Sequence, residues 1–226
     1  MKIKGPTDHP AFFLKPSTSL AGHRSPIRLR PSHGLTHSEP ELAVVIGRTL
    51  SNVPPDEVYP GVFGYTIMND VTSVRMRDED SFTFRYFKQN VETGEISQSE
   101  AHTSYAGRYK GSDTFGPCGP YIVTRDEIPD PHALEIRCMM DDQVIARDQT
   151  KNYVWSVPLA ISHISRNMTL LPGDIVSMGT AAGRAEDENE GNSVPTTFKA
   201  DLQGYAGEVS ISITRIGVLS SSVLAV

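Results

Sequence analysis

Cysteines, basic clusters and long apolar runs are scarce in this chain. Only two of its 226 residues are cysteines, Cys118 and Cys138. Their separation does not match metal-ligand spacing, so they are either reduced core residues or a disulfide. The net charge of −6 and the pI of about 5.6 argue against a nucleic-acid partner. No apolar run approaches the roughly 18 residues of a membrane helix, and no hydrophobic secretory segment opens the chain. We therefore expect a cytoplasmic protein with no membrane partner.

A hydrophobic content of 38% is enough for one core, and we predict a single domain over residues 1–226. Residues 1–11 are expected to be a short N-terminal extension. Two segments lack a clear hydrophobic period and are predicted to be surface loops. The first covers residues 81–109, which are polar with scattered aromatics, and the second covers the acidic residues 184–197.

Sixteen prolines and eighteen glycines divide the chain into short segments. A helix is predicted over 157–167, because Val157, Ile161 and Ile164 recur at helical spacing and Pro158 occupies the first turn. Strands outnumber helices and do not alternate regularly with them, which favours a β-rich α+β fold over a doubly wound sheet. The strands are predicted at 42–46, 64–67, 121–123, 134–139, 175–178 and 209–213.

Two glutamates stand where the first long strand begins, in the sequence Glu39-Pro40-Glu41. Alternate residues of a strand share a face, so both carboxylates would point the same way. Pro40 is tolerated because it lies at the start of the strand. Adjacent carboxylates repel each other unless a cation lies between them, and Mg²⁺ or Mn²⁺ takes carboxylate oxygens as ligands. The alternative is that both glutamates are solvated at the strand entrance.

Three further segments carry candidate site residues. Asp70 follows an apolar strand and would complete a three-carboxylate set with Glu39 and Glu41; alternatively, it caps a turn or a helix. Lys110 lies in a turn bracketed by glycine and proline, where a fixed cation suits an anionic ligand, although most lysines are solvated. The turn Gly179-Thr180 offers N–H groups and a hydroxyl to a carboxylate, or it is a plain tight turn.

Taken in this order, the segments resemble the fumarylacetoacetate hydrolase family. The likeness covers nearly the whole chain apart from the first ten residues and the two polar segments. The motifs that carry it are Phe12-Phe13-Leu14-Lys15-Pro16-Ser17-Thr18, Glu39-Pro40-Glu41 with the strand that follows, Gly64-Tyr65, Asn69-Asp70-Val71-Thr72, Lys110-Gly111, Asp113-Thr114-Phe115-Gly116-Pro117, Ser156-Val157-Pro158, Leu171-Pro172-Gly173-Asp174 and Gly179-Thr180.

The resemblance implies a mixed-sheet β roll or sandwich that forms a homodimer and holds Mg²⁺ or Mn²⁺. By motif position, Glu39, Glu41 and Asp70 match the metal ligands, and Lys110 matches the active-site lysine. Gly179-Thr180 matches the turn that binds the substrate carboxylate. Members of the family act on 2-oxo or enolisable dicarbonyl acids as C–C hydrolases, isomerases or decarboxylases, through an enolate that the metal stabilises.

The chain departs from the family pattern near its N-terminus. Hydrolytic members carry an Asn-Tyr-x-x-His-x-x-Glu segment before the Phe-Leu-Lys-Pro motif, and its His/Glu pair activates water. Here His9 is the only histidine in that region, and no nearby glutamate accompanies it. His37, two residues before Glu39, is a candidate base or a hydrogen-bond partner of a metal ligand. The alternative is a structural histidine.

A second departure follows Asp70. The family pattern places an arginine four residues later, where this chain has Val74, with Arg75 and Arg77 displaced by one and three positions. The sequence does not show which of these arginines faces the substrate. Residues 81–109 come directly afterwards, and a longer segment beside an active site would change the substrate that it accepts.

The leading hypothesis is a metal-dependent hydrolase of a C–C bond in a 2-oxo or 1,3-diketo acid. The missing His/Glu segment favours an alternative, an isomerase or decarboxylase of a 2-hydroxydienedioate or 2-oxo acid in the degradation of aromatic compounds. A third hypothesis is a non-catalytic homodimer that binds a small acid. The complete three-carboxylate set with Lys110 argues against that third hypothesis.

Overall fold

The structure is a computed structural model that describes residues 9–180 and 200–226. Within these residues the strands form two five-stranded sheets and two two-stranded ribbons. In spatial order, the first sheet contains β1 (Leu20–Ala21), β9 (Gly116–Thr124), β5 (Val62–Asn69), β4 (Pro40–Ile46) and β12 (Ile175–Ser177). The second contains β11 (Gln143–Gln149), β10 (Glu135–Met140), β13 (Glu208–Ile213), β14 (Gly217–Ala225) and β2 (Ile27–Leu29).

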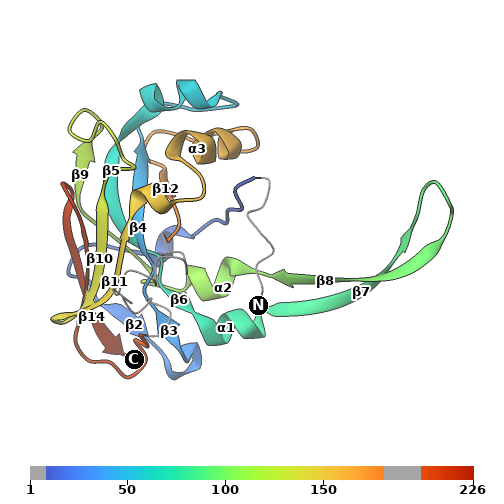
Figure 1. The fold of residues 1–226 in the computed structure, drawn as a ribbon. Helices are drawn as coiled ribbons and strands as arrows, with labels where there is room; N and C mark the ends of the chain where they lie inside the picture. The colour runs from blue at the N-terminus through green and yellow to red at the C-terminus, as the bar shows by residue number, and fades with distance from the viewer. Residues whose placement is uncertain (1–8, 181–199) are drawn as a thin grey trace, which may run out of the picture.

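The two sheets face each other, because β4 contacts β10 and β5 contacts β13 and β14 (Figure 1). Both sheets are mixed: β1 pairs with β9 in parallel, as β2 does with β14, whereas β4 is antiparallel to β5 and β12. Two strand pairs lie outside these sheets: β3 (Thr36–His37) with β6 (Thr72–Ser73), and β7 (Ser81–Gln89) with β8 (Ile96–Ser104). The helices are α1 (Val74–Glu79), α2 (Ala106–Gly111) and α3 (Val157–Ser165). Short 3₁₀ turns are found at Ser17–Ser19, Pro31–His33, Pro55–Glu57, Tyr59–Gly61 and Thr150–Asn152.

Strand β4 lies inside the first sheet, and every one of its residues is buried. A strand that is covered on both faces has an unbroken apolar sequence, which explains why residues 42–46 do not alternate with polar ones. Strand β13 differs, because Val209, Ile211 and Ile213 are buried while the serines between them are partly exposed. These two patterns place the core between the sheets, with the entrance of β4 at its edge.

The predicted β-rich α+β class is confirmed, and every predicted strand overlaps an observed one. The predicted helix is α3, which carries Pro158 in its first turn. Cys118 and Cys138 are both free thiols, so the disulfide alternative is wrong. None of the described helices is long and apolar enough to cross a membrane.

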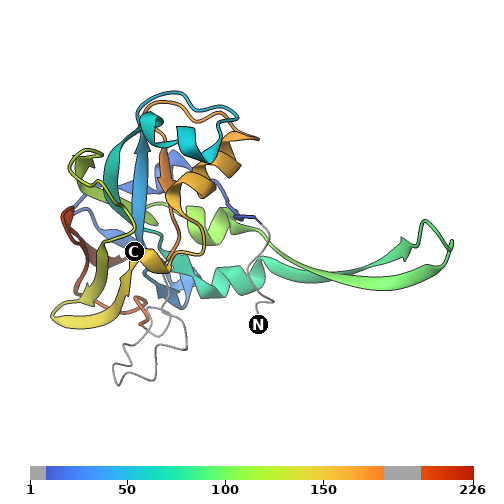
Figure 2. The same cartoon turned by 45° about the horizontal axis from the view of Figure 1, so that its top comes forward.

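Residues 81–109 are not the loop that the sequence predicted. They form the antiparallel pair β7–β8, whose turn lies at residues 90–95, and the first part of α2. The pair projects away from the two sheets in both views (Figures 1 and 2). The expected exposure is correct, since most side chains of β7 and β8 are exposed. The predicted loop at 184–197 lies outside the described residues, as do residues 1–8 of the expected N-terminal extension.

Candidate metal and active site

The start of β4 meets the end of β5, and this contact brings three acidic side chains together. Pro40 is paired with Asn69 in the ladder, and the Asp70 N–H donates to the Glu39 carbonyl at 2.9 Å. One carboxylate oxygen from each of Glu39, Glu41 and Asp70 lies within 4.8 Å of the other two. The structure therefore assembles the three predicted metal ligands around one point.

The local sequence holds the entrance of β4 in place. Pro40 is the first residue of the strand, as the sequence predicted, and it has no N–H to donate. The backbone N–H of Glu39 is bound by the side-chain oxygen of Asn69 at 3.1 Å, and the Asn69 amide donates to Ser38 Oγ at 3.1 Å. This network orients the strand entrance so that Glu39 and Glu41 reach the same point.

Two lysines supply positive charge to the carboxylates. Lys110 Nζ donates to Glu39 Oε2 at 2.8 Å and to Asp70 Oδ2 at 2.7 Å. Lys15 Nζ donates to the other oxygen of Asp70 at 2.7 Å, and it also contacts the backbone carbonyls of Lys110 and Phe115. Lys110, which is on α2, thus lies in the predicted cluster, but Lys15 was not predicted as a site residue. Its only sequence signal was its place in the Phe-Leu-Lys-Pro motif.

Glu41 is held by the strand and turn that end at the predicted substrate-carboxylate motif. Ser177 Oγ and the Gly179 N–H donate to its Oε2 at 2.5 and 3.1 Å. The Thr180 hydroxyl lies 3.3 Å from an oxygen of Glu41 and from one of Glu39. Gly179 adopts a φ of +86°, a backbone region that favours glycine. In this structure the donors of the turn therefore bind the glutamates themselves.

Glu39 has two further partners on the β3–β6 ribbon. His37 Nε2 lies 3.0 Å from Glu39 Oε1, and Thr72 Oγ1 donates to the same oxygen at 2.8 Å. His37 is buried and does not line the cavity described below. His37 is therefore placed to orient Glu39 and is not placed to act as a base on a substrate in the cavity.

Burial and crowding give the two glutamates opposite pKa shifts. Burial acts to raise the pKa of Glu39, but the hydrogen bond from His37 and the charge of Lys110 outweigh it and lower that pKa to about 2. Burial, together with the negative charges of Asp70 and Glu39, raises the pKa of Glu41 to about 8. Glu41 thus retains its proton more readily than Glu39, and a divalent cation bound between the carboxylates would favour the deprotonated form of Glu41.

The lysines are also perturbed. Burial acts to lower the pKa of the Lys110 ammonium, but the charges of Glu39 and Asp70 outweigh it and raise that pKa. For Lys15 burial is the larger effect, and its pKa is lowered despite the ion pair with Asp70. Lys110 is therefore the more firmly charged of the two cations.

A cavity of about 780 Å³ opens beside the cluster. Lys15, Glu41 and Asp70 line it together with Gly179-Thr180. Lys110 is not among the lining residues, but its Nζ lies 5.5 Å from the ring centroid of Phe13, which is one of them. The other walls are largely apolar, with Phe12, Leu14, Val154, Trp155, Ile164 and Met168 among them. The cavity is large enough for a small organic acid.

The donor set fits a hard divalent cation. It consists of three carboxylates, whose oxygens are the ligands that Mg²⁺ and Mn²⁺ prefer. Each carboxylate oxygen that accepts one hydrogen bond retains a second lone pair for a metal. Glu39, Glu41 and Asp70 would hold the ion, with the cavity supplying room for water and a ligand on the open side.

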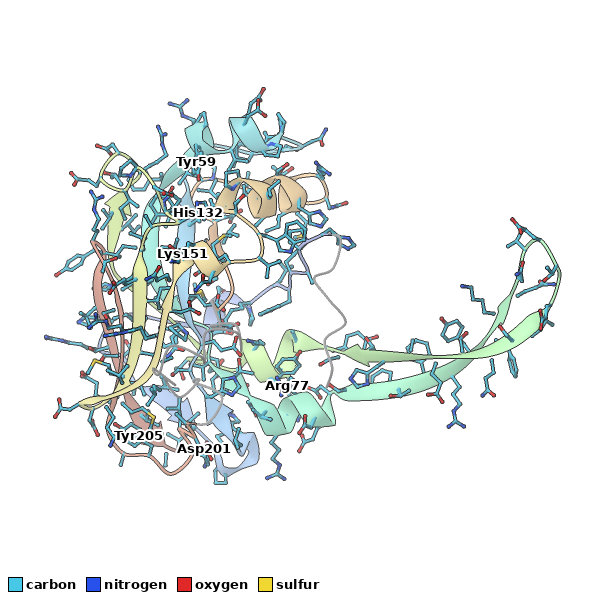
Figure 3. All side chains as sticks on the ribbon, viewed as in Figure 1. Tyr59, Arg77, His132, Lys151, Asp201 and Tyr205 are labelled. Atoms are coloured by element: carbon cyan, nitrogen blue, oxygen red, sulfur yellow. The ribbon has the colours of Figure 1, made fainter. Side chains whose placement is uncertain are left out.

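The arginines that follow Asp70 do not reach this cavity. Arg75 is mostly exposed, forms an ion pair with Glu79 at 3.2 Å and lies against Gly34. Arg77 lies on α1 near the base of the β7–β8 pair (Figure 3). Neither of them lines the cavity in the described structure. Arg75 thus pairs within α1 rather than with the carboxylate cluster.

Comparison with known proteins places these features in a family. A family model described as fumarylacetoacetate (FAA) hydrolase C-terminal matches residues 2–224. Protein Rv2993c of Mycobacterium tuberculosis (strain ATCC 25618 / H37Rv) is 36% identical over 194 residues, which make up 86% of this chain and 64% of that protein. The chain thus spans less than two thirds of the length of this relative.

Two solved structures have the same fold. The 5-carboxymethyl-2-hydroxymuconate delta-isomerase from Mycobacterium smegmatis matches with a TM-score of 0.73 at 30% identity, covering 97% of this chain and 71% of that chain. A maleylpyruvate hydrolase from Sphingobium sp. SYK-6, in complex with manganese(II) ion and pyruvate, matches with a TM-score of 0.70 at 27% identity, covering 96% and 65%. Since the family model spans nearly the whole chain, this protein belongs to the fumarylacetoacetate hydrolase family.

Proposed function

We propose that this protein is a Mg²⁺- or Mn²⁺-dependent enzyme that hydrolyses a C–C bond in a 2-oxo or 1,3-diketo acid. The observation that carries the proposal is the convergence of Glu39, Glu41 and Asp70 within 4.8 Å of one another beside a cavity. The similar maleylpyruvate hydrolase, in complex with manganese(II) ion and pyruvate, supports both the type of cation and the class of small oxo acid.

In this proposal the residues of the site have different roles. A bound Mg²⁺ or Mn²⁺ supplies Lewis-acid stabilisation of negative charge on a substrate oxygen. Glu39, Glu41 and Asp70 hold the cation, and His37 and Thr72 keep Glu39 in place. Lys110, whose ammonium is fixed between two carboxylates, adds a permanent positive charge close to the oxygen on which negative charge develops.

The substrate carboxylate is assigned to Gly179-Thr180. In the structure these donors bind Glu41 and Glu39, so substrate must share them with the glutamates or displace them. The Thr180 hydroxyl has a single proton that can rotate, so it can turn from a glutamate oxygen to an oxygen of the substrate carboxylate. The apolar lining around Trp155 and Phe12 encloses the remainder of the substrate and excludes water from it.

Isomerisation or decarboxylation is the second candidate reaction. Hydrolysis needs a base that makes water nucleophilic, and no histidine is among the described residues that line the cavity. The similarity to a 5-carboxymethyl-2-hydroxymuconate delta-isomerase supports this alternative, whose physiological setting would be the degradation of aromatic compounds.

One assay separates the reactions. The purified protein is incubated with Mg²⁺ or Mn²⁺ and with acylpyruvates, oxaloacetate and 2-hydroxydienedioates, and the products are identified by mass. Two fragments whose masses add up to substrate plus water indicate hydrolysis, a loss of CO₂ indicates decarboxylation, and a spectral change at constant mass indicates isomerisation. Hydrolysis of none of the substrates, with another reaction observed, would replace the leading proposal by the second.

The remaining hypothesis, a non-catalytic protein that binds small acids, is tested by titration. If the protein does not bind Mn²⁺ or Mg²⁺ at millimolar concentration and turns over no substrate, the enzymatic proposal is wrong. The family resemblance also leads us to propose a homodimer in the cytoplasm, with a small oxo acid rather than a macromolecule as the substrate.

A further inference from the structure

Strands β7 and β8 form a ribbon over residues 81–104, here called the arm, which projects from the body of the protein (Figures 1 and 2). Side chains alternate between the two faces of a strand. One face of the arm therefore carries a row of three aromatic rings on β7 beside a row of small side chains on β8, and we call it the aromatic face. The cross-strand pairs on this face are Phe82 with Thr103, Phe84 with Ala101 and Tyr86 with Ser99.

The rings of the aromatic face contact one another but are not covered. The Phe82 and Phe84 centroids are 6.4 Å apart, those of Phe84 and Tyr86 are 5.9 Å apart, and Tyr105 lies 5.8 Å from Phe82. Each of these four side chains remains between 42% and 63% exposed. A contiguous apolar patch of this kind marks an interaction site, and a two-stranded ribbon gains little stability by itself.

The opposite face of the arm carries mainly polar and charged side chains, which pair across the two strands. Thr83 Oγ1 lies 3.2 Å from His102 Nδ1, and Arg85 pairs with Glu100 at 2.6 Å. Two apolar side chains also lie on this face, Phe87 of β7 and Ile96 of β8, and they are 77% and 66% exposed. Charged side chains are depleted from the centres of protein interfaces. On the aromatic face the one charged side chain is Lys88, opposite Ser97 at the outer end of the row, so the distribution of charge favours this face as the interface.

Ion pairs and hydrogen bonds fix the base of the arm. Arg108 on α2 pairs with Asp80 at 2.7 Å and with Glu79 at 2.9 Å, which ties together the two chain segments that enter the arm. Ser104 Oγ accepts from Ser81 at 2.9 Å and lies 3.0 Å from the Tyr109 hydroxyl. These contacts connect the base of the arm to α1 and α2 and orient the arm where it leaves the body.

We propose that the aromatic face is a dimerisation surface whose partner is the aromatic face of a second copy of this chain. The face carries large side chains in one row and small side chains in the neighbouring row, so the aromatic row can act as a ridge and the small row as the groove that receives it. Rotation of a second copy about an axis along the arm sets each ridge over the groove of the other, as an isologous contact requires.

The available surface agrees with this assignment. An aromatic side chain buries about 150–250 Å² when it is fully covered. The four half-exposed rings therefore supply roughly half of the 800 Å² or so per partner that a standard interface buries. The proposal therefore requires the body next to the arm to contribute the remainder. This inference concerns the arm alone and does not depend on the reaction that the protein catalyses.

Matched variants on the two faces test the proposal. The metal-loaded full-length protein is expected to sediment as a dimer of 24.7-kDa chains at micromolar concentration. Phe84→Glu places a carboxylate in the centre of the interface of each copy and is expected to raise the dimer dissociation constant at least about 100-fold. Phe87→Glu, the same change three residues later on the polar face, is expected to leave the dissociation constant unchanged.

A third variant distinguishes shape-specific dimerisation from unspecific hydrophobic association. Ala101→Trp adds apolar surface but fills the groove, so it is expected to weaken the dimer, whereas unspecific hydrophobic association would become stronger. Far-UV circular dichroism and Mn²⁺ titration check that each variant is folded. A monomeric wild type, a dimer that persists in Phe84→Glu, or equal dissociation in Phe84→Glu and Phe87→Glu would overturn the proposal.

Discussion

The ammonium of Lys15 lies 2.7 Å from Oδ1 of Asp70, although 55 positions separate the two residues in the chain. The same ammonium contacts the backbone carbonyl of Lys110, which places its Nζ on the other oxygen of Asp70. Each carboxylate oxygen of Asp70 thus accepts a hydrogen bond from a different lysine, and the two lysines come from distant parts of the sequence. This arrangement makes Lys15 a positioning residue for the candidate metal site.

Replacement of Lys15 by Met is expected to destabilise the protein by about 1–3 kcal/mol, because one oxygen of Asp70 and two backbone carbonyls lose a donor while Lys110 still pairs with Asp70. The measurement is the free energy of unfolding from chemical denaturation. Arg85→Met is the matched control, since it breaks an ion pair whose side chains are 71% and 55% exposed and is expected to cost less than about 1 kcal/mol. Equal unfolding free energies for wild type and Lys15→Met would contradict the assigned role.

Replacement of Asp70 by Asn keeps the shape of the side chain but removes its charge. We expect the affinity for Mn²⁺ to fall by more than about 100-fold and turnover to be lost, because a carboxylate ligand becomes a neutral amide. Isothermal titration measures the affinity, and circular dichroism checks the fold. Asp56→Asn, at an exposed position, is the control and should bind Mn²⁺ like the wild type. Undiminished Mn²⁺ binding in Asp70→Asn would remove Asp70 from the ligand set.

Replacement of Lys110 by Met separates catalysis from metal binding. The ammonium competes with a metal ion for Glu39 and Asp70, so its loss should leave the Mn²⁺ affinity equal or higher. Turnover is expected to fall about 100-fold or more, because a fixed charge that stabilises the transition state is removed. The readouts are Mn²⁺ titration and kcat. Lys151→Met, at an exposed lysine that Figure 3 labels, is the control; unchanged kcat in Lys110→Met would exclude Lys110 from the mechanism.

The thiols offer a test of the core that is independent of the site. Burial raises the pKa of Cys138 to about 12, so at pH 8 almost no reactive thiolate is present at this residue. We expect a thiol reagent to leave Cys138 unmodified in the folded protein and to label both cysteines after denaturation, as measured by mass spectrometry. Rapid labelling of Cys138 without denaturant would show that the second sheet opens readily.

The central strands could be predicted because burial leaves a direct mark on local sequence. Residues 42–46 are apolar without a break and lie in a doubly covered strand, and residues 209–213 alternate in a half-covered one. The arm could not be recognised in the same way. Aromatic side chains on one face and polar side chains on both strands resemble an irregular loop, and only the pairing of β7 with β8 reveals the alternation.

The candidate site likewise contains features that the local sequence predicts and features that it does not. The sequence alone places two carboxylates on one side of a strand entrance, because the two-residue spacing across Pro40 is a local property of extended backbone. It also marks Asp70 and Lys110 as candidates through their flanking turns. It contains no local signal that Lys15 binds Asp70, or that the turn Gly179-Thr180 binds Glu41. Those contacts join segments that are far apart in the chain.

By itself, then, the amino-acid sequence determined which strands are buried, where acidic side chains gather at the start of β4 and to which family the chain is similar. Such features depend on neighbours within a few residues along the backbone. Tertiary structure decided which cations neutralise the carboxylates, which donors surround Glu41 and how an apparent loop becomes an arm with one aromatic face. These depend on the pairing of β4 with β5 and of β7 with β8, and the free energy of such long-range pairing is not encoded in any single segment.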